Sequence, residues 1–178
     1  MRAFVTYDTL KTFSGKSEAT SLTKSASEKS GKTVFLSHSS KDHDLLPGVV
    51  LILENHGGRV YVDERDSKLS GANGFEAANR LREVVKSCRK FVLFVTEKAK
   101  DSKWIPWELG LGDGEKNPYN IALFPSAENQ YNQSWSEQEY LGLYQRIIWG
   151  NFAGKESEWL VLDHRKNTAV GLRDWLTR

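Results

Sequence analysis

A single glutamate, Glu108, stands beside two tryptophans in a segment that could hold a flat or positively charged molecule. Residues 102–110 read SKWIPWELG, so Trp104 and Trp107 lie three positions apart and Glu108 follows the second ring directly. A short apolar run at residues 91–95 places Glu108 in the first turns of a helix that follows a strand. The carboxylate could stabilise positive charge on a bound molecule, or it could only favour the helix N-terminus while the tryptophans pack in the core. These residues alone leave both interpretations open.

A polar loop at residues 37–43 contains residue types that occur in two other kinds of site. Ser37, His38 and Asp42 are the types of a hydrolytic triad, but they fall in one short loop without the nucleophile-elbow pattern Gly-x-Ser-x-Gly. His38 and His43 flank Asp42, yet no cysteine or further histidine stands close by to complete a metal site. We therefore interpret the triad as a coincidence and predict no metal.

Composition and motifs argue against several classes of protein. A formal net charge of +2 is too small to indicate binding to nucleic acid or to an anionic membrane surface. No apolar run reaches the roughly 18 residues of a membrane span. Neither a P-loop nor the Gly-x-Gly-x-x-Gly dinucleotide fingerprint is present. Cys88 is the only cysteine and no export signal is evident, so we expect a cytoplasmic protein.

The elements that must position Glu108 alternate between strand and helix. We expect strands at residues 34–36, 60–62, 91–95, 121–125 and 159–162, and helices at residues 45–53, 75–88, 140–149 and 170–176, with the segment around Glu108 as the start of a further helix. Short, continuously apolar strands are typical of a parallel sheet that helices cover on both faces. The pattern thus predicts one α/β domain with a doubly wound five-stranded sheet. In such sheets ligands bind beyond the carboxyl ends of the strands, where Glu108 would lie.

The N-terminal residues do not follow this alternation. Residues 3–7 could be a short strand or the start of a helix, and residues 14–32 are rich in Ser, Thr, Lys, Gly and Glu. Such a composition indicates a flexible linker or a solvated helix. We therefore expect residues 1–32 to be a partly flexible extension and residues 33–178 to be the domain.

Four segments resemble the motifs of TIR (Toll/interleukin-1 receptor) domains in their bacterial form. Residues 34–42, VFLSHSSKD, are similar to the first-strand motif of the family, and residues 60–66, VYVDERD, to the second strand as it enters the BB loop. Residues 89–95 resemble the third strand. Residues 102–109 resemble the Ser-x-Trp…Glu-Leu motif, although many relatives have a smaller residue than Trp107 before the glutamate. Four motifs in the same order make a specific resemblance, which implies a flavodoxin-like sheet.

The resemblance implies one of two functions. Many TIR domains cleave NAD at the nicotinamide–ribose bond, and a standalone bacterial TIR protein resembles the component of Thoeris anti-phage defence that makes a cyclic ADP-ribose isomer for an effector protein. Hydrolysis to ADP-ribose is the close alternative. A non-catalytic scaffold, including one that interferes with host TIR signalling, is the other class. NAD would then be a substrate and no cofactor is expected. Homo-oligomers through TIR–TIR contacts, commonly made by the BB loop, are also implied.

The resemblance also implies roles for individual residues. Glu108 would stabilise the oxocarbenium-like ribose cation; no general acid is required, because nicotinamide leaves a cationic pyridinium as a neutral molecule. Each other candidate has a structural alternative such as helix capping, packing, turn formation or surface exposure. These candidates are Phe35, Leu36 and Ser37 beside the nicotinamide and its ribose, Arg65 at the pyrophosphate, Asp66 in the BB loop, Lys103 near Glu108 or a phosphate, and Trp104 against the substrate. Residues 126–158 are either an insertion that shapes product choice or variable packing.

Overall fold

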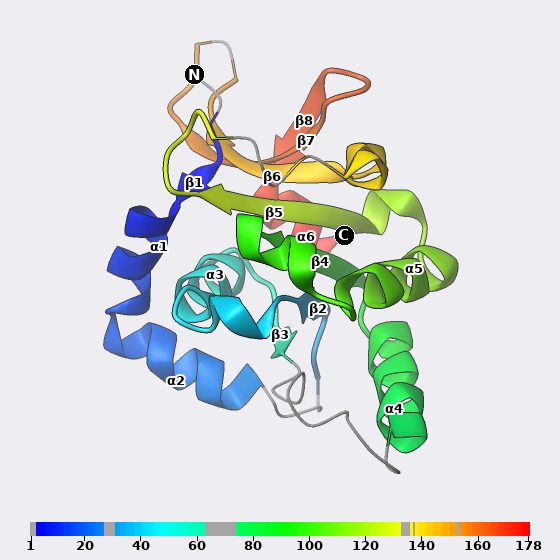
Figure 1. Cartoon of the computed structure of the whole chain (residues 1–178). Coiled ribbons are helices and arrows are strands. Elements are labelled where there is room, and N and C mark those ends of the chain that lie inside the picture. The colour runs from blue at the N-terminus through cyan, green and yellow to red at the C-terminus, as the bar shows by residue number, and fades with distance from the viewer. Residues whose placement is uncertain (1–2, 27–30, 63–73, 133–135, 137, 153) are drawn as a thin grey trace.

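The computed structural model describes residues 3–26, 31–62, 74–132, 136, 138–152 and 154–178. Within these residues eight strands form one sheet in the order β3-β2-β4-β5-β6-β7-β8, with β1 paired to β5 (Figure 1). Strands β2 to β6 are parallel to one another, whereas β7 is antiparallel to both of its neighbours, β6 and β8. The strands are β1 (Val5–Thr6), β2 (Val34–Ser37), β3 (Val60–Val62), β4 (Lys90–Val95), β5 (Ile121–Ala127), β6 (Gln145–Gly150), β7 (Glu158–Asp163) and β8 (Thr168–Gly171).

The order of the parallel strands is that of a flavodoxin-like sheet. Strands β2 to β6, numbered along the chain as one to five, lie in the order two-one-three-four-five. The predicted doubly wound α/β class is therefore confirmed. The prediction was wrong about which segment forms the fifth parallel strand: this strand is β6, and residues 159–162 belong to the antiparallel β7. Only residues 151–157 join β6 to β7, too few for the crossover that a parallel strand needs.

One predicted helix was also wrong, and another was predicted to begin two residues too early. Residues 140–149 do not form a helix; a 3-10 turn at Glu139–Leu143 leads directly into β6. The β-branched pair Ile147 and Ile148 favours a strand, and a short apolar run does not by itself distinguish a strand from a buried helix. The start of the last predicted helix belongs to β8, and the helix itself begins at Leu172.

Helices cover both faces of the sheet and build two cores. Alternation along β4 shows this directly: Val92 and Phe94 join the core beneath α1, α3 and α6, whereas Phe91, Leu93 and Val95 join the core beneath α4 and α5. The helices are α1 (Tyr7–Ser14), α2 (Ser17–Ala26), α3 (Leu46–Asn55), α4 (Gly74–Ser87), α5 (Ile105–Glu115) and α6 (Leu172–Thr177). Among the described residues, no helix is both long and apolar enough to cross a membrane.

The N-terminal segment packs against the sheet and α3. The Ser126 hydroxyl donates a hydrogen bond of 2.8 Å to the Val5 carbonyl, where β1 pairs with the carboxyl end of β5. A Cβ atom on Gly48 of α3 would lie 2.5 Å from the Leu10 carbonyl oxygen, so α1 and α3 approach closely only because this residue is glycine. For α2 a linker and a solvated helix were both predicted; the structure has a helix, and its residue Ala19 is fully buried.

Candidate active site

Ser37 and Glu108 meet at the carboxyl end of β2. Ser37 is the last residue of β2, and its hydroxyl donates a hydrogen bond to Oε2 of Glu108, 71 positions later in the chain. Both side chains are buried, with exposed fractions of 1% and 7%. A buried carboxylate that accepts a hydroxyl hydrogen bond has a fixed orientation, as a group aimed at one position of a bound molecule requires.

Helix α5 places Glu108 at this position through a close approach to the sheet. Glu108 lies in the first turn, where the helix dipole favours a negative charge, and its backbone N–H donates to the Trp104 carbonyl at 2.8 Å. Gly112 is one turn further along the same face of the helix. A Cβ atom there would come within 2.7 Å of the Phe91 ring on β4, so the absence of a side chain sets the distance between helix and strand.

The two tryptophans have different surroundings. Their rings pack edge to face at 5.7 Å between centroids. Trp107 packs against the core beneath α4 and α5, and the Arg82 guanidinium lies 5.6 Å from its ring centroid. Trp104 instead lines a surface cavity. We conclude that Trp107 is mainly a packing residue and that Trp104 is available to a ligand.

The cavity beside Trp104 lies between the loops that follow β2 and β4. Its volume is about 230 Å³, and Lys41 and Asp101 bridge its two loops with an exposed ion pair of 2.9 Å. Lysine, serine and tryptophan side chains together suit a ligand that carries both anionic groups and flat rings. The lining residues are Ser39, Ser40, Lys41, Asp101, Ser102, Lys103 and Trp104.

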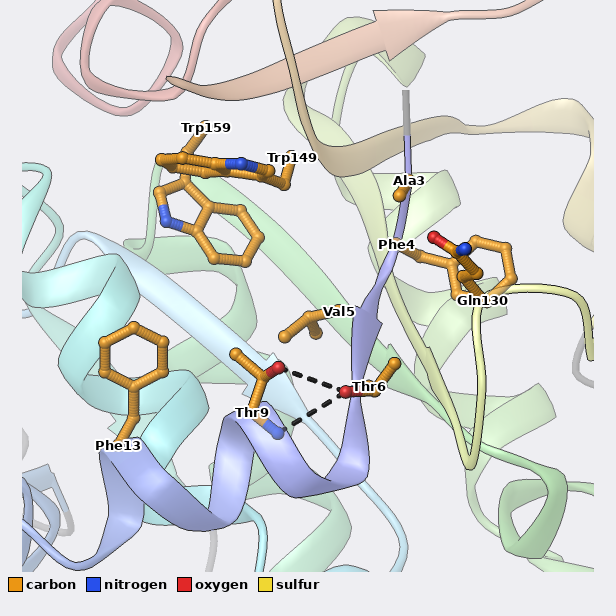
Figure 2. A pocket seen from close by; sticks show the side chains of 9 residues that line it. All are labelled: Ala3, Phe4, Val5, Thr6, Thr9, Phe13, Gln130, Trp149 and Trp159. Atoms are coloured by element: carbon orange, nitrogen blue, oxygen red, sulfur yellow. Dashed lines mark hydrogen bonds between the residues drawn. The ribbon is translucent and has the colours of Figure 1, made fainter. Parts of the chain in front are cut away.

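A second cavity of about 420 Å³ lies between the N-terminal segment and strands β6 and β7. Figure 2 shows the indoles of Trp149 and Trp159 at one end of this cavity, with Phe13 of α1 nearby. None of the described residues that line it is charged, so these residues offer no counter-charge to a phosphate. The cavity beside Trp104 is therefore the better candidate for an anionic ligand. The lining residues are Ala3, Phe4, Val5, Thr6, Thr9, Phe13, Gln130, Trp149 and Trp159.

The sequence of the parallel sheet matches a known family. Residues 34–159 match the TIR domain family. The chain belongs to this family. It is also 34% identical to the probable 3' cyclic ADP-D-ribose synthase ThsB' of Bacillus cereus (strain MSX-D12), over 145 residues that cover 80% of this chain and 74% of that protein. The resemblance drawn from the four motifs is thereby confirmed.

The TIR fold brings some of the predicted site residues together and separates others. Ser37 and Glu108 share a hydrogen bond, and Lys103 and Trp104 line the cavity close by in the chain. Phe35 is buried in a ring stack with Tyr61 and Phe91, at 5.8 and 5.3 Å, and Leu36 is buried in the opposite core. The side chains of these two residues thus support β2 from within the sheet. Arg65 and Asp66 lie outside the described residues.

Two further polar residues of the first TIR motif are buried. His38 is 9% exposed, and burial lowers the pKa of its imidazole to about 4, so it is neutral near pH 7. Asp42 is fully buried and accepts a hydrogen bond of 2.7 Å from the Thr96 hydroxyl, at the end of β4. The sequence analysis did not identify Thr96 as a site residue. Its signal was its position: it is a polar residue directly after the apolar strand β4, and such residues lie at the carboxyl edge of the sheet. In the part of the chain that the structure describes, no three metal-ligating side chains converge.

Proposed function

We propose that this TIR protein is an NAD-consuming enzyme that breaks the nicotinamide–ribose bond and forms a cyclic ADP-ribose isomer as a signal in anti-phage defence. The observation that carries the proposal is the buried Ser37–Glu108 pair, which is joined to the lining of the Trp104 cavity by the hydrogen bond from the Glu108 backbone N–H to the Trp104 carbonyl. The relative named as a probable 3' cyclic ADP-D-ribose synthase supports the same choice of product.

The chemistry explains why one carboxylate is sufficient. The nicotinamide of NAD is a cationic pyridinium, so when its bond to the ribose breaks, the electron pair stays on nitrogen and a neutral molecule leaves. The positive charge moves to the ribose, where Glu108 stabilises it in a site that holds little water. Ser37 orients the carboxylate by donating to Oε2. Trp104 stacks on the substrate. Lys103 and Arg65 bind its phosphates, and Asp66, which opens the BB loop, is a further substrate-binding residue.

The second half of the reaction decides the product. When a hydroxyl oxygen of the adenosine ribose bonds to the cation, a cyclic ADP-ribose forms and the hydroxyl proton is released. When water reaches the cation first, the products are ADP-ribose and a proton. The same buried carboxylate serves both outcomes, so the product depends on how the cavity folds the adenosine back and excludes water.

Two further aspects belong to this proposal. Copies of the chain assemble through TIR–TIR contacts; Phe75, the last residue of the BB loop (66–75), is 74% exposed and supplies apolar surface for such a contact. The enzyme acts in the cytoplasm, where its nucleotide product activates a separate effector protein.

Incubation of the purified protein with NAD, with and without a crowding agent, tests the proposal when products are separated by chromatography and identified by mass. Glu108→Gln should lower nicotinamide release by about 10²–10³-fold. Glu115→Gln is the matched control, because this glutamate is exposed in the last turn of the same helix. The proposal is wrong if wild type releases no nicotinamide in vitro or in phage-infected cells. Equal release from Glu108→Gln would remove the role of Glu108 alone.

A further inference from the structure

Asp42 lies buried between the two loops that form the Trp104 cavity. The loop after β2 contributes Ser39, Ser40 and Lys41 to the cavity, and the loop after β4 contributes residues 101–104. Asp42 belongs to the first loop and Thr96 begins the second. Their hydrogen bond of 2.7 Å therefore links the two walls of the cavity from inside the protein.

The surroundings of Asp42 are unusual for a carboxylate. Its side chain has no exposed surface, and its second oxygen, Oδ1, accepts no hydrogen bond from the part of the chain that the structure describes. Burial raises the pKa of this carboxyl group, with the Thr96 hydroxyl acting in the opposite direction. A buried carboxyl group with one partner costs stability, and a valine or leucine would pack at less cost. Some property other than stability therefore explains a carboxylate here.

The N-terminal segment supplies the third member of this cluster. Tyr7, the first residue of α1, places its phenol beside the Thr96 hydroxyl, the Glu97 backbone and the Asp42 carboxylate. Thr6 caps α1 and bonds to Thr9, which fixes the start of the helix next to Tyr7 (Figure 2). This segment lies before residues 34–159, the part that matches the TIR family.

We propose that Asp42 is a positioning residue: together with Thr96 and with Tyr7 of the N-terminal segment, it fixes the spacing of the two loops around the Trp104 cavity and so governs substrate binding. Lys41 is the direct neighbour of Asp42, and Trp104 follows Thr96 by eight positions. A shift of either loop therefore changes the cavity. Glu108 stands on α5, which Gly112 holds against β4. Loss of the Asp42 contact should thus weaken binding more than chemistry.

The test uses Thr96→Val, which keeps the shape of the side chain and removes the donor to Asp42, and Tyr7→Phe, which removes only the phenol oxygen. Backbone hydrogen exchange in the substrate-free protein is measured first. Thr96→Val should speed exchange about tenfold in residues 38–44 and 96–104, with little change in α4. Thr12→Val is the matched control, because its hydroxyl is exposed on α1.

The kinetic part of the test rests on the proposed function. Thr96→Val should raise KM for NAD about tenfold and change kcat less than about twofold. Unchanged exchange in both loops of the folded variants, or equal acceleration throughout the chain, would overturn the proposal. A fall in kcat at constant KM would also overturn it. If neither wild type nor any variant cleaves NAD, the proposed function fails, but hydrogen exchange still tests whether Asp42 fixes the two loops. The failures of the two proposals can therefore be distinguished.

Discussion

Acid should destabilise this protein through His38 before it affects most carboxylates. The His38 imidazole is 9% exposed at the end of β2, and burial is the main reason that its pKa falls to about 4. In the unfolded chain the same group has a pKa of about 6.5. Between these values the unfolded state binds a proton that the folded state does not. Lowering the pH through this window therefore favours unfolding.

The size of the effect follows from the two pKa values of His38. The gap between 6.5 and about 4 corresponds to a loss of about 3 kcal/mol when the titration is complete. Between about pH 7.5 and about pH 5.5 the loss should be about 1.4 kcal/mol. His164, whose pKa burial also lowers, acts in the same direction. Asp42, whose pKa burial raises, acts in the opposite direction.

Urea denaturation of wild type and His38→Gln at several pH values isolates the contribution of His38. Glutamine does not titrate, so the other groups cancel when the two pH profiles are subtracted. The difference in unfolding free energy should shrink by about 1.4 kcal/mol from about pH 7.5 to about pH 5.5. Parallel profiles for the two proteins over this range would refute the reasoning, because they would mean that His38 takes up its proton equally in the folded state.

Three further predictions follow from packing and from the buried pair. In the same urea titration, Gly48→Ala should lower the free energy of unfolding by about 2 kcal/mol, because the new methyl group meets a backbone carbonyl of α1. Gly110→Ala, which has open space around it, should instead raise the free energy of unfolding by up to about 1 kcal/mol. The Cys88 thiol, whose pKa burial raises to about 11, should react with a thiol reagent at least about 100-fold more slowly in the folded than in the urea-unfolded protein; equal rates would contradict its burial. Ser37→Ala should lower the rate of nicotinamide release about tenfold, because Glu108 loses an orienting hydrogen bond, and wild-type kinetics would exclude that role.

The sequence was sufficient to locate the strands of the sheet that are continuously apolar. Strands β2, β3, β4 and β5 begin within one residue of the predicted positions. In β6 the pattern is mixed: Ile147 and Ile148 are buried, Trp149 is 45% exposed, and polar residues precede them. Helix and strand share such a pattern, and pairing with β5 and β7 decides between them.

The candidate site was predictable only in part. The family motifs indicate that Ser37 and Glu108 lie at the carboxyl edge of the sheet, but their hydrogen bond depends on how closely α5 approaches β4. The contact of Tyr7 with Thr96 had no signal in the sequence, because it depends on the docking of α1 against Gly48. Long-range contacts of this kind follow from packing and not from local residue pattern.

The N-terminal strand has a consequence for the design of shorter variants. Strand β5 pairs with β6 at Ala122 and Leu123 and with β1 at its last two residues, while Ala3 exchanges backbone hydrogen bonds with Trp149 of β6. Residues 3–6 thus fill the space where β5 and β6 diverge. A chain trimmed to residues 33–178 would leave unpaired backbone groups on both strands, and such edges recruit other strands. Self-association of the trimmed protein would then report edge-to-edge aggregation in place of the TIR–TIR contacts proposed for the full chain.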